Sequence, residues 1–178
     1  MKLTPETLET PVTLRPVREG DGRFLFEVYA STRSEELAQV GWSEPQRQDF
    51  LEMQFNAQRR YYESEYPGAE FRIILAEEQP AGRLYVHRRE NEIRIMDLAL
   101  LPAYRGRGIG SRLLQEILAE GERSCQPVTI HVEIFNPALK LYEGLGFRQI
   151  ASNGVYHLLQ WTPPDSKVFK PPSPTPFQ

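Results

Sequence analysis

The sequence of 178 residues has a single cysteine, Cys125, and only three histidines. One cysteine excludes an internal disulfide and a zinc site built from several cysteines, and it is typical of a reducing cytoplasm. His87, His131 and His157 lie far apart along the chain and form no metal-ligand motif. We therefore expect no metal cofactor.

Long hydrophobic runs and an excess of positive charge are also missing. The longest apolar runs, residues 73–76 and 98–101, are four residues long, whereas a bilayer span needs about 20. The first eleven residues lack the apolar segment of a secretory signal, and the net charge is −3, which is not the footprint of a general nucleic-acid binder. We expect a cytoplasmic protein with neither a membrane nor a nucleic acid as partner.

What is present is the composition of a globular domain. Apolar residues make up 40% of the chain and charged residues 25%, and the length fits one domain. Residues 163–178 hold six of the fifteen prolines, which predicts an extended tail. The expected organisation is a domain over residues 1–162 followed by this tail.

Hydrophobic periodicity predicts the order β-α-α-β-β-β-α-β-α-β-β. The predicted strands cover residues 12–17, 71–77, 82–88, 92–101, 128–132, 147–151 and 155–161. The long helices are predicted after Asp21, over residues 44–66 and from the glycine-rich segment to about Ser124. This order predicts an α/β fold, with a mixed sheet of about seven strands and helices on both faces.

Local signals place the ends and faces of these elements. Asp21 is expected to cap the first helix, and Pro137 to lie in the first turn of the last helix. Gln79 and Pro80 are expected to separate two hairpin strands. The second helix is predicted to carry Phe50, Met53, Ala57 and Tyr61 on one face. A buried stripe is predicted on the third helix, comprising Ile109, Leu113, Leu114, Ile117 and Leu118.

The chemistry of the sequence concentrates in a glycine-rich turn between a strand and a helix. This segment reads Arg105-Gly106-Arg107-Gly108-Ile109-Gly110-Ser111. Glycines allow a tight turn and a close approach of backbone to a ligand, and the helix that follows presents free N–H groups at its positive end. Together with the two arginines, this pattern indicates an anion site suited to phosphate.

Spacing separates three nucleotide-binding motifs at this turn. A P-loop requires a lysine before Ser or Thr, and no lysine stands before Ser111. The dinucleotide fingerprint requires GxGxxG in a parallel βαβ unit, but here the spacing is GxGxG after antiparallel hairpins. The pattern [QR]-x-x-G-x-[GA] is satisfied by Arg105, Gly108 and Gly110.

With this pattern the sequence resembles the GNAT superfamily of acyl-CoA-dependent N-acetyltransferases. The resemblance is carried by LALLPAYRGRGIGSRLL and, downstream, IHVEIFNPALKLYEGLGF, which correspond to the pyrophosphate loop and the Asn…Tyr helix of that family. The element order matches over roughly residues 12–161. The resemblance implies a mostly antiparallel sheet whose central strand pair splays apart between residues 96–100 and 131–135.

Acetyl-CoA is the acyl donor that the resemblance implies. The amides of Arg107, Gly108, Ile109, Gly110 and Ser111 would surround the pyrophosphate, with Arg105 and Gly106 in the same turn. Backbone groups of Leu98 and Leu100 would contact the pantetheine and thioester, although both side chains also suit a core. Asn136 would contact the cofactor arm, and an N-cap role before Pro137 is compatible with that.

Three residues are candidates for catalysis by direct attack of an amine on acetyl-CoA. Tyr142 resembles the family's general acid, and packing against the sheet is the alternative role. Glu92, thirteen residues before Arg105, matches the glutamate base of the histone-modifying branch, and Asp97 would lie nearer the thioester. For both acids the alternatives are structural, a solvated strand end for Glu92 and a paired acid for Asp97.

The resemblance places the acceptor, a small-molecule or peptide amine, between residues 31–44 and 152–156. A homodimer is compatible with the sequence. The competing function is a non-catalytic acyl-CoA sensor, which would keep the glycine-rich turn and Asn136 but would need neither Tyr142 nor a base.

Overall fold

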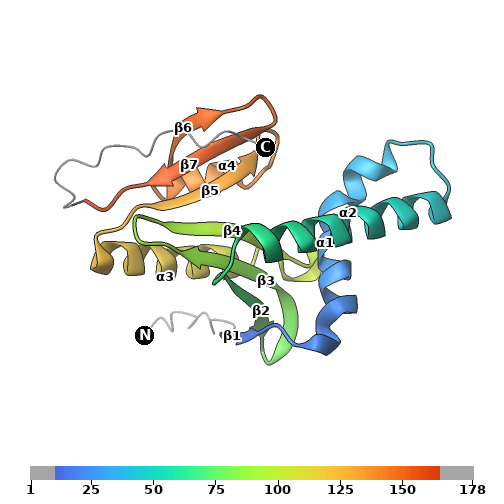
Figure 1. Ribbon diagram of the computed structural model, residues 1–178, viewed down its shortest axis with the longest axis horizontal. Helices are drawn as coiled ribbons and strands as arrows, with labels where there is room; N and C mark the ends of the chain where they lie inside the picture. The colour runs from blue at the N-terminus through green and yellow to red at the C-terminus, as the bar shows by residue number, and fades with distance from the viewer. Residues whose placement is uncertain (1–10, 165–178) are drawn as a thin grey trace, which may run out of the picture.

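The computed structural model describes residues 11–164, which form one seven-stranded sheet with the order β1-β2-β3-β4-β5-β7-β6 (Figure 1). Neighbouring strands are antiparallel except β4 and β5, which are parallel. The strands are β1 (Val12–Pro16), β2 (Glu70–Ala76), β3 (Gln79–Arg88), β4 (Ile93–Leu100), β5 (Val128–Glu133), β6 (Arg148–Ser152) and β7 (Tyr156–Trp161). The predicted fold class is confirmed.

Helices cover both faces of the sheet. On one face lie α1 (Gly22–Ala38) and α2 (Glu44–Glu65), and on the other α3 (Ile109–Ser124) and α4 (Leu139–Gly144). Two short 3-10 helices, η1 (Glu19–Asp21) and η2 (Pro102–Tyr104), precede α1 and α3. Because a parallel strand pair needs a crossover, α3 is the element that carries the chain from β4 to β5.

Each face of the sheet has its own core. Ile73 belongs to the cluster beneath α1 and α2, whereas its neighbour Ile74 belongs to the cluster beneath α3, and both are 0% exposed. Successive strand side chains point to opposite faces, so a strand buried on both sides is continuously apolar. This explains the apolar run of residues 73–76.

The buried stripe predicted for α3 is confirmed, because all five of its residues are buried in the larger core. The apolar face predicted for α2 is not the face that the structure buries. Met53 is 57% exposed and Tyr61 48% exposed, whereas Phe55 is buried against Phe26 and Tyr29 of α1. The helix carries apolar residues on two faces, and packing against α1 decides which one is buried.

Three local expectations are corrected. The Asp21 side chain does not cap α1, because it accepts hydrogen bonds from Arg15 at 2.7 and 2.8 Å and from the Arg18 amide at 2.7 Å. Pro137 lies in a turn before α4, which begins at Leu139. Gln79 and Pro80 belong to β3, and the hairpin turn lies before them, at Glu77 and Glu78.

The described residues stop short of both ends of the chain. Within residues 11–164, no helix is both long and apolar enough to cross a membrane. The described residues end at position 164, so the proline-rich tail predicted over residues 163–178 lies outside them except for its first two residues. The first ten residues of the predicted domain also lie outside them.

The hairpin between β2 and β3 turns through Glu77 and Glu78, which have φ values of 50° and 65°. Two residues with positive φ match a type I′ turn, which favours Asn-Gly and costs other residues about 1–2 kcal/mol each. We predict that Glu78→Gly raises the free energy of unfolding by about 1 kcal/mol and Tm by about 2–4 °C, measured by calorimetry.

The matched control is Glu90→Gly, at an exposed glutamate in the next hairpin that is not among the positive-φ residues. There glycine only adds backbone freedom to the unfolded chain, so stability should fall slightly. Equal effects of the two substitutions would contradict the interpretation of the turn.

Candidate active site

The pairing of β4 with β5 stops after three residue pairs. Ile93 faces Val128, Arg94 faces Thr129 and Ile95 faces Ile130, and no later pair follows. Strand β4 nevertheless stays paired with β3 through Leu100, and β5 stays paired with β7 through Glu133. Past Ile95, the edge of β4 that faces β5 therefore has no strand partner.

A bulge in β4 lies where the separation begins. Tyr85 pairs with Asp97 and Val86 with Ile95, so Met96 is the extra residue. A bulge bends its strand and re-aims nearby side chains. The Met96 carbonyl accepts a hydrogen bond from the Tyr62 hydroxyl of α2 at 3.4 Å, which ties the bulge to the helix above it.

The glycine-rich turn follows β4 after the short 3-10 helix η2. Gly108 has a φ of 77° and occupies the N-cap position of α3. Its carbonyl accepts the first helical bond, from the Arg112 amide at 3.0 Å, so the amides of the three residues between them have no partner within the helix. A Cβ at Gly108 would meet no atom within 4 Å, so this backbone is open to a ligand.

The two arginines of the turn have different roles. Arg105 donates to the Leu100 carbonyl at 2.9 Å and to the Ser31 hydroxyl at 3.2 Å. It therefore braces the turn against the end of β4 and against α1. The Arg107 guanidinium lies over the Tyr104 ring at 5.5 Å from its centroid and is exposed, which leaves its charge available to an anion.

The remaining predicted donor contacts lie around the opening between β4 and β5. Leu98 and Leu100 are partly buried against the α3-side core, and the Leu100 carbonyl is the group that Arg105 already occupies. The Asn136 side-chain oxygen accepts from the Ala138 amide at 2.9 Å. It thereby organises the turn before α4 and leaves the NH₂ group of its side chain as a donor.

Tyr142 lies in α4 and is 5% exposed. Its ring meets the ring of Phe147 edge-on, at 5.5 Å between centroids. Burial, and then the negative charge of Asp97, raise the pKa of the Tyr142 hydroxyl. The hydroxyl is thus held protonated, as a hydrogen-bond donor, within the field of Asp97.

Asp97 forms a salt bridge with Arg83 of β3, whose side chain is 3% exposed. Arg83 also donates to the Gln58 side chain of α2 at 2.9 Å. The sequence reasoning overlooked Arg83, although a single arginine inside the apolar strand segment AGRLYV was a signal that it has a partner. The Asp97 side chain keeps 19% of its surface exposed.

Glu92 lies in a separate network at the start of β4. Its carboxylate accepts from Thr129 at 2.6 Å, Arg89 at 3.0 Å and Arg94 at 3.2 Å. Burial by itself would raise the pKa of this carboxyl, but Arg94, Thr129 and Arg89 together hold it below its usual range. At about 3.3 Å per strand residue, Glu92 lies roughly 13 Å from Met96.

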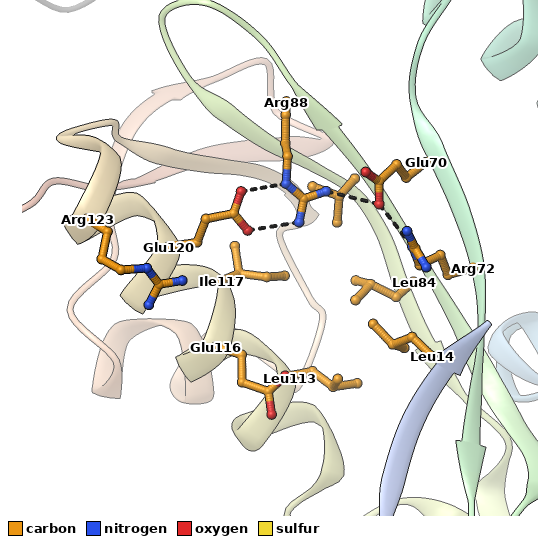
Figure 2. A pocket seen from close by; sticks show the side chains of 11 residues that line it. Leu14, Glu70, Arg72, Leu84, Arg88, Leu113, Glu116, Ile117, Glu120 and Arg123 are labelled. Atoms are coloured by element: carbon orange, nitrogen blue, oxygen red, sulfur yellow. Dashed lines mark hydrogen bonds and ion pairs between the residues drawn. The ribbon is translucent and has the colours of Figure 1, made fainter. Parts of the chain in front are cut away.

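A cavity of about 230 Å³ lies on the face of the sheet that α3 covers, between α3 and strands β1 to β3 (Figure 2). Arg88 crosses it, donating to Glu120 of α3 at 2.8 Å and pairing with Glu70 at 3.2 Å. None of the predicted site residues lines this cavity. Within residues 11–164, no cluster of His, Cys, Asp or Glu could hold a metal ion.

Comparisons with known proteins agree with this architecture. Residues 67–149, from the end of α2 to β6, match the family model of the acetyltransferase (GNAT) domain. No match to the sequence is found among the curated proteins.

Solved structures share the fold at low sequence identity. The PaiA N-acetyltransferase of Thermoplasma acidophilum, in complex with coenzyme A, is 18% identical with a TM-score of 0.65, over 85% of this chain and 99% of that one. Naa50 of Arabidopsis thaliana, in complex with the bisubstrate analogue CoA-Ac-MVNAL, is 20% identical with a TM-score of 0.53, over 85% and 98%. An acetyl-CoA-bound GNAT acetyltransferase of Elizabethkingia anophelis is 17% identical with a TM-score of 0.54, over 85% and 97%. The match over residues 67–149 and the solved structures agree that this chain has the fold of GNAT acetyltransferases.

Proposed function

We propose that the protein transfers an acetyl group from acetyl-CoA to a primary amine by direct attack of the amine on the thioester. The observation that carries this proposal is the continuity of two features. The unpaired edge of β4 is followed, after η2, by a turn whose backbone amides, at the start of α3, have no partner within the helix. The extended thiol arm of the donor needs an unpaired strand edge, and its pyrophosphate needs unpaired backbone amides.

In this proposal the pyrophosphate lies against the amides of residues 107–111, with Arg107 adding charge. Arg105 holds the turn in place through its bonds to Leu100 and Ser31. The pantetheine arm pairs with the open edge of β4 near Leu98, and the Asn136 side chain donates to the arm from the other side. The CoA and acetyl-CoA complexes among the structural neighbours support this choice of donor.

A base is needed because an alkyl amine with a pKa of about 10.4 is more than ~99% protonated at pH 7. Asp97 is the stronger candidate, since it flanks the bulge and its charge reaches Tyr142. Its pairing with Arg83 fixes its position while a part of the carboxylate remains exposed. Glu92 is the weaker candidate, because its three donors lower its proton affinity and it lies farther along the strand.

Tyr142 is proposed to stabilise the departing CoA thiolate. A tyrosine pKa of about 10 exceeds a thiol pKa of about 8.5, so full proton transfer would be uphill by roughly 2 kcal/mol in water. The raised pKa of the buried hydroxyl makes transfer harder still, but keeps it a donor. Its contribution is therefore a hydrogen bond to the developing thiolate, with any proton transfer late.

The acceptor amine is proposed to enter between α1 and the β6–β7 loop. The Ile134 amide donates to the Val155 carbonyl at 3.0 Å, which fastens this loop to the end of β5. Arg33 of α1 bonds Glu133 at 3.1 Å on the same strand end. Phe135, 91% exposed, lies beside this entrance and offers an apolar surface to the acceptor.

Acetyl-CoA is expected to raise Tm, whereas NAD and ATP are not. At a hundredfold excess over Kd, binding adds about 2.7 kcal/mol, which is about 5–10 °C for a chain of this size. The same protein should then release CoA thiol from acetyl-CoA when screened against a library of primary amines. A larger shift with NAD would overturn the cofactor assignment, and CoA binding without turnover on any amine would favour the sensor function.

Gly108→Asp is expected to abolish binding of acetyl-CoA while the protein stays folded. The added carboxylate would face the pyrophosphate at the closest approach of the backbone. Gly108→Asn is the matched control, because it has the same shape and tolerates positive φ but carries no charge. Calorimetric titration should therefore show a larger loss for Asp than for Asn, and similar losses would assign the effect to backbone strain instead.

Tyr142→Phe keeps the ring and its packing on Phe147, so it separates the proposed role from a structural one. We expect kcat to fall by about 10²-fold with the Kd for CoA nearly unchanged. The loss should be smaller for an acyl donor with a better leaving group. A kcat within about threefold of wild type would remove Tyr142 from the chemical step.

A further inference from the structure

A cavity of about 300 Å³ lies between α1, α2 and strands β2 and β3. Its lining includes Leu25, Phe55, Tyr62, Phe71, Arg83 and Tyr85, none of which belongs to the predicted donor or catalytic set. Because its lining contains no residue of β4, β5 or the glycine-rich turn, the cavity is separate from the path proposed for acetyl-CoA. Its volume lies in the range of small-molecule sites.

The walls of this cavity are largely aromatic. Phe71 meets Tyr85 edge-on at 4.8 Å between ring centroids, and Tyr62 meets Tyr85 at 5.9 Å. Interlocked rings of this kind form a rigid surface that suits another flat ring. Since an apolar cavity of about 150 Å³ admits benzene, this volume accommodates a ring with several substituent atoms.

One polar group in the wall lacks a partner. Arg83 is 2% exposed and uses one terminal nitrogen, Nη2, on both Asp97 and Gln58. Its Nε–H has no hydrogen-bond partner among residues 11–164. A buried donor without an acceptor is unfavourable, so a ligand oxygen that moved within reach of it would gain an otherwise missing hydrogen bond.

The charges around the cavity cancel. Asp97 balances Arg83, and at the exposed rim Arg59 and Glu63 form an ion pair at 3.7 Å. A surplus of negative charge, which an ammonium group would need, is therefore absent from the lining residues. The unpaired Arg83 Nε–H requires an acceptor atom, and that atom need not be charged.

We propose that this cavity binds a small neutral aromatic molecule that carries a carbonyl oxygen, with the ring between Phe71, Tyr62 and Tyr85 and the oxygen accepting from Arg83 Nε. Such a molecule is neither the acyl donor nor an amine acceptor. Two lining residues also bond the β4 bulge, Tyr62 to the Met96 carbonyl and Arg83 to Asp97. If the proposed acetyl transfer operates, occupation of the cavity should change its rate without competition with acetyl-CoA.

The test uses the full chain without acetyl-CoA and three probes of similar size, acetophenone, ethylbenzene and 1-phenylethylamine. Calorimetry and nitrogen-15 NMR of arginine Nε–H groups measure binding and the contact. Acetophenone should bind and shift the Arg83 Nε–H resonance, identified through Arg83→Lys, and ethylbenzene should bind more weakly without that shift. The ammonium form of 1-phenylethylamine should not bind.

Val17→Phe places a ring into the cavity that Val17 lines and should weaken acetophenone binding at least tenfold. Leu14→Phe is the matched control, because it places the same ring in the other cavity, shown in Figure 2, and should leave binding unchanged. No acetophenone binding at millimolar concentration, equal binding to Val17→Phe, or tighter binding of the ammonium would each overturn the proposal. These measurements involve no acetyl transfer, so they stand even if the proposed function fails.

Discussion

The three-residue limit on the pairing of β4 with β5 is the constraint from which the site arises. A full ladder would satisfy the backbone of both strands and close the sheet. The bulge at Met96 turns β4 away just beyond the last pair, and α3 begins its return at the far end of the same strand. One local irregularity thus produces an unpaired strand edge close to the glycine-rich turn.

Side chains from outside β4 hold this irregular strand in place. Tyr62 bonds the bulge from α2, Arg83 holds Asp97 from β3, and Arg105 joins the strand end to α1. Each contact crosses from the sheet to another element or strand. The geometry of the candidate site therefore depends on contacts with α1, α2 and β3, and not on the glycine-rich segment alone.

Sequence reasoning predicted the parts of the fold that depend on local pattern. The α3 stripe and the order of elements along the chain follow from periodicity, and the glycine turn follows from spacing. The buried face of α2 could not be predicted, because the helix carries apolar residues on two faces and packing against Phe26 and Tyr29 of α1 selects between them. The hairpin at Glu77 and Glu78 was misplaced for a different reason, since its conformation lacks the usual residues.

The same division holds for the candidate site. Gly108 and Asn136 stand where their motifs put them, at the head of α3 and before α4. The partners of Glu92 and Asp97 could not be predicted, because Thr129 and Arg83 are brought to them by strand register. Register is set by the packing of both faces together, so a single sequence shows the acids but not their environment.

The back-to-back placement of Ile73 and Ile74 has a consequence for folding cooperativity. The two cores share β2 and β3 as a common wall, so neither can open without exposing apolar surface of the other. The domain is then expected to unfold as one unit, without a separately stable half. By mass action, a molecule bound on either side of the sheet stabilises the packing on the opposite side as well.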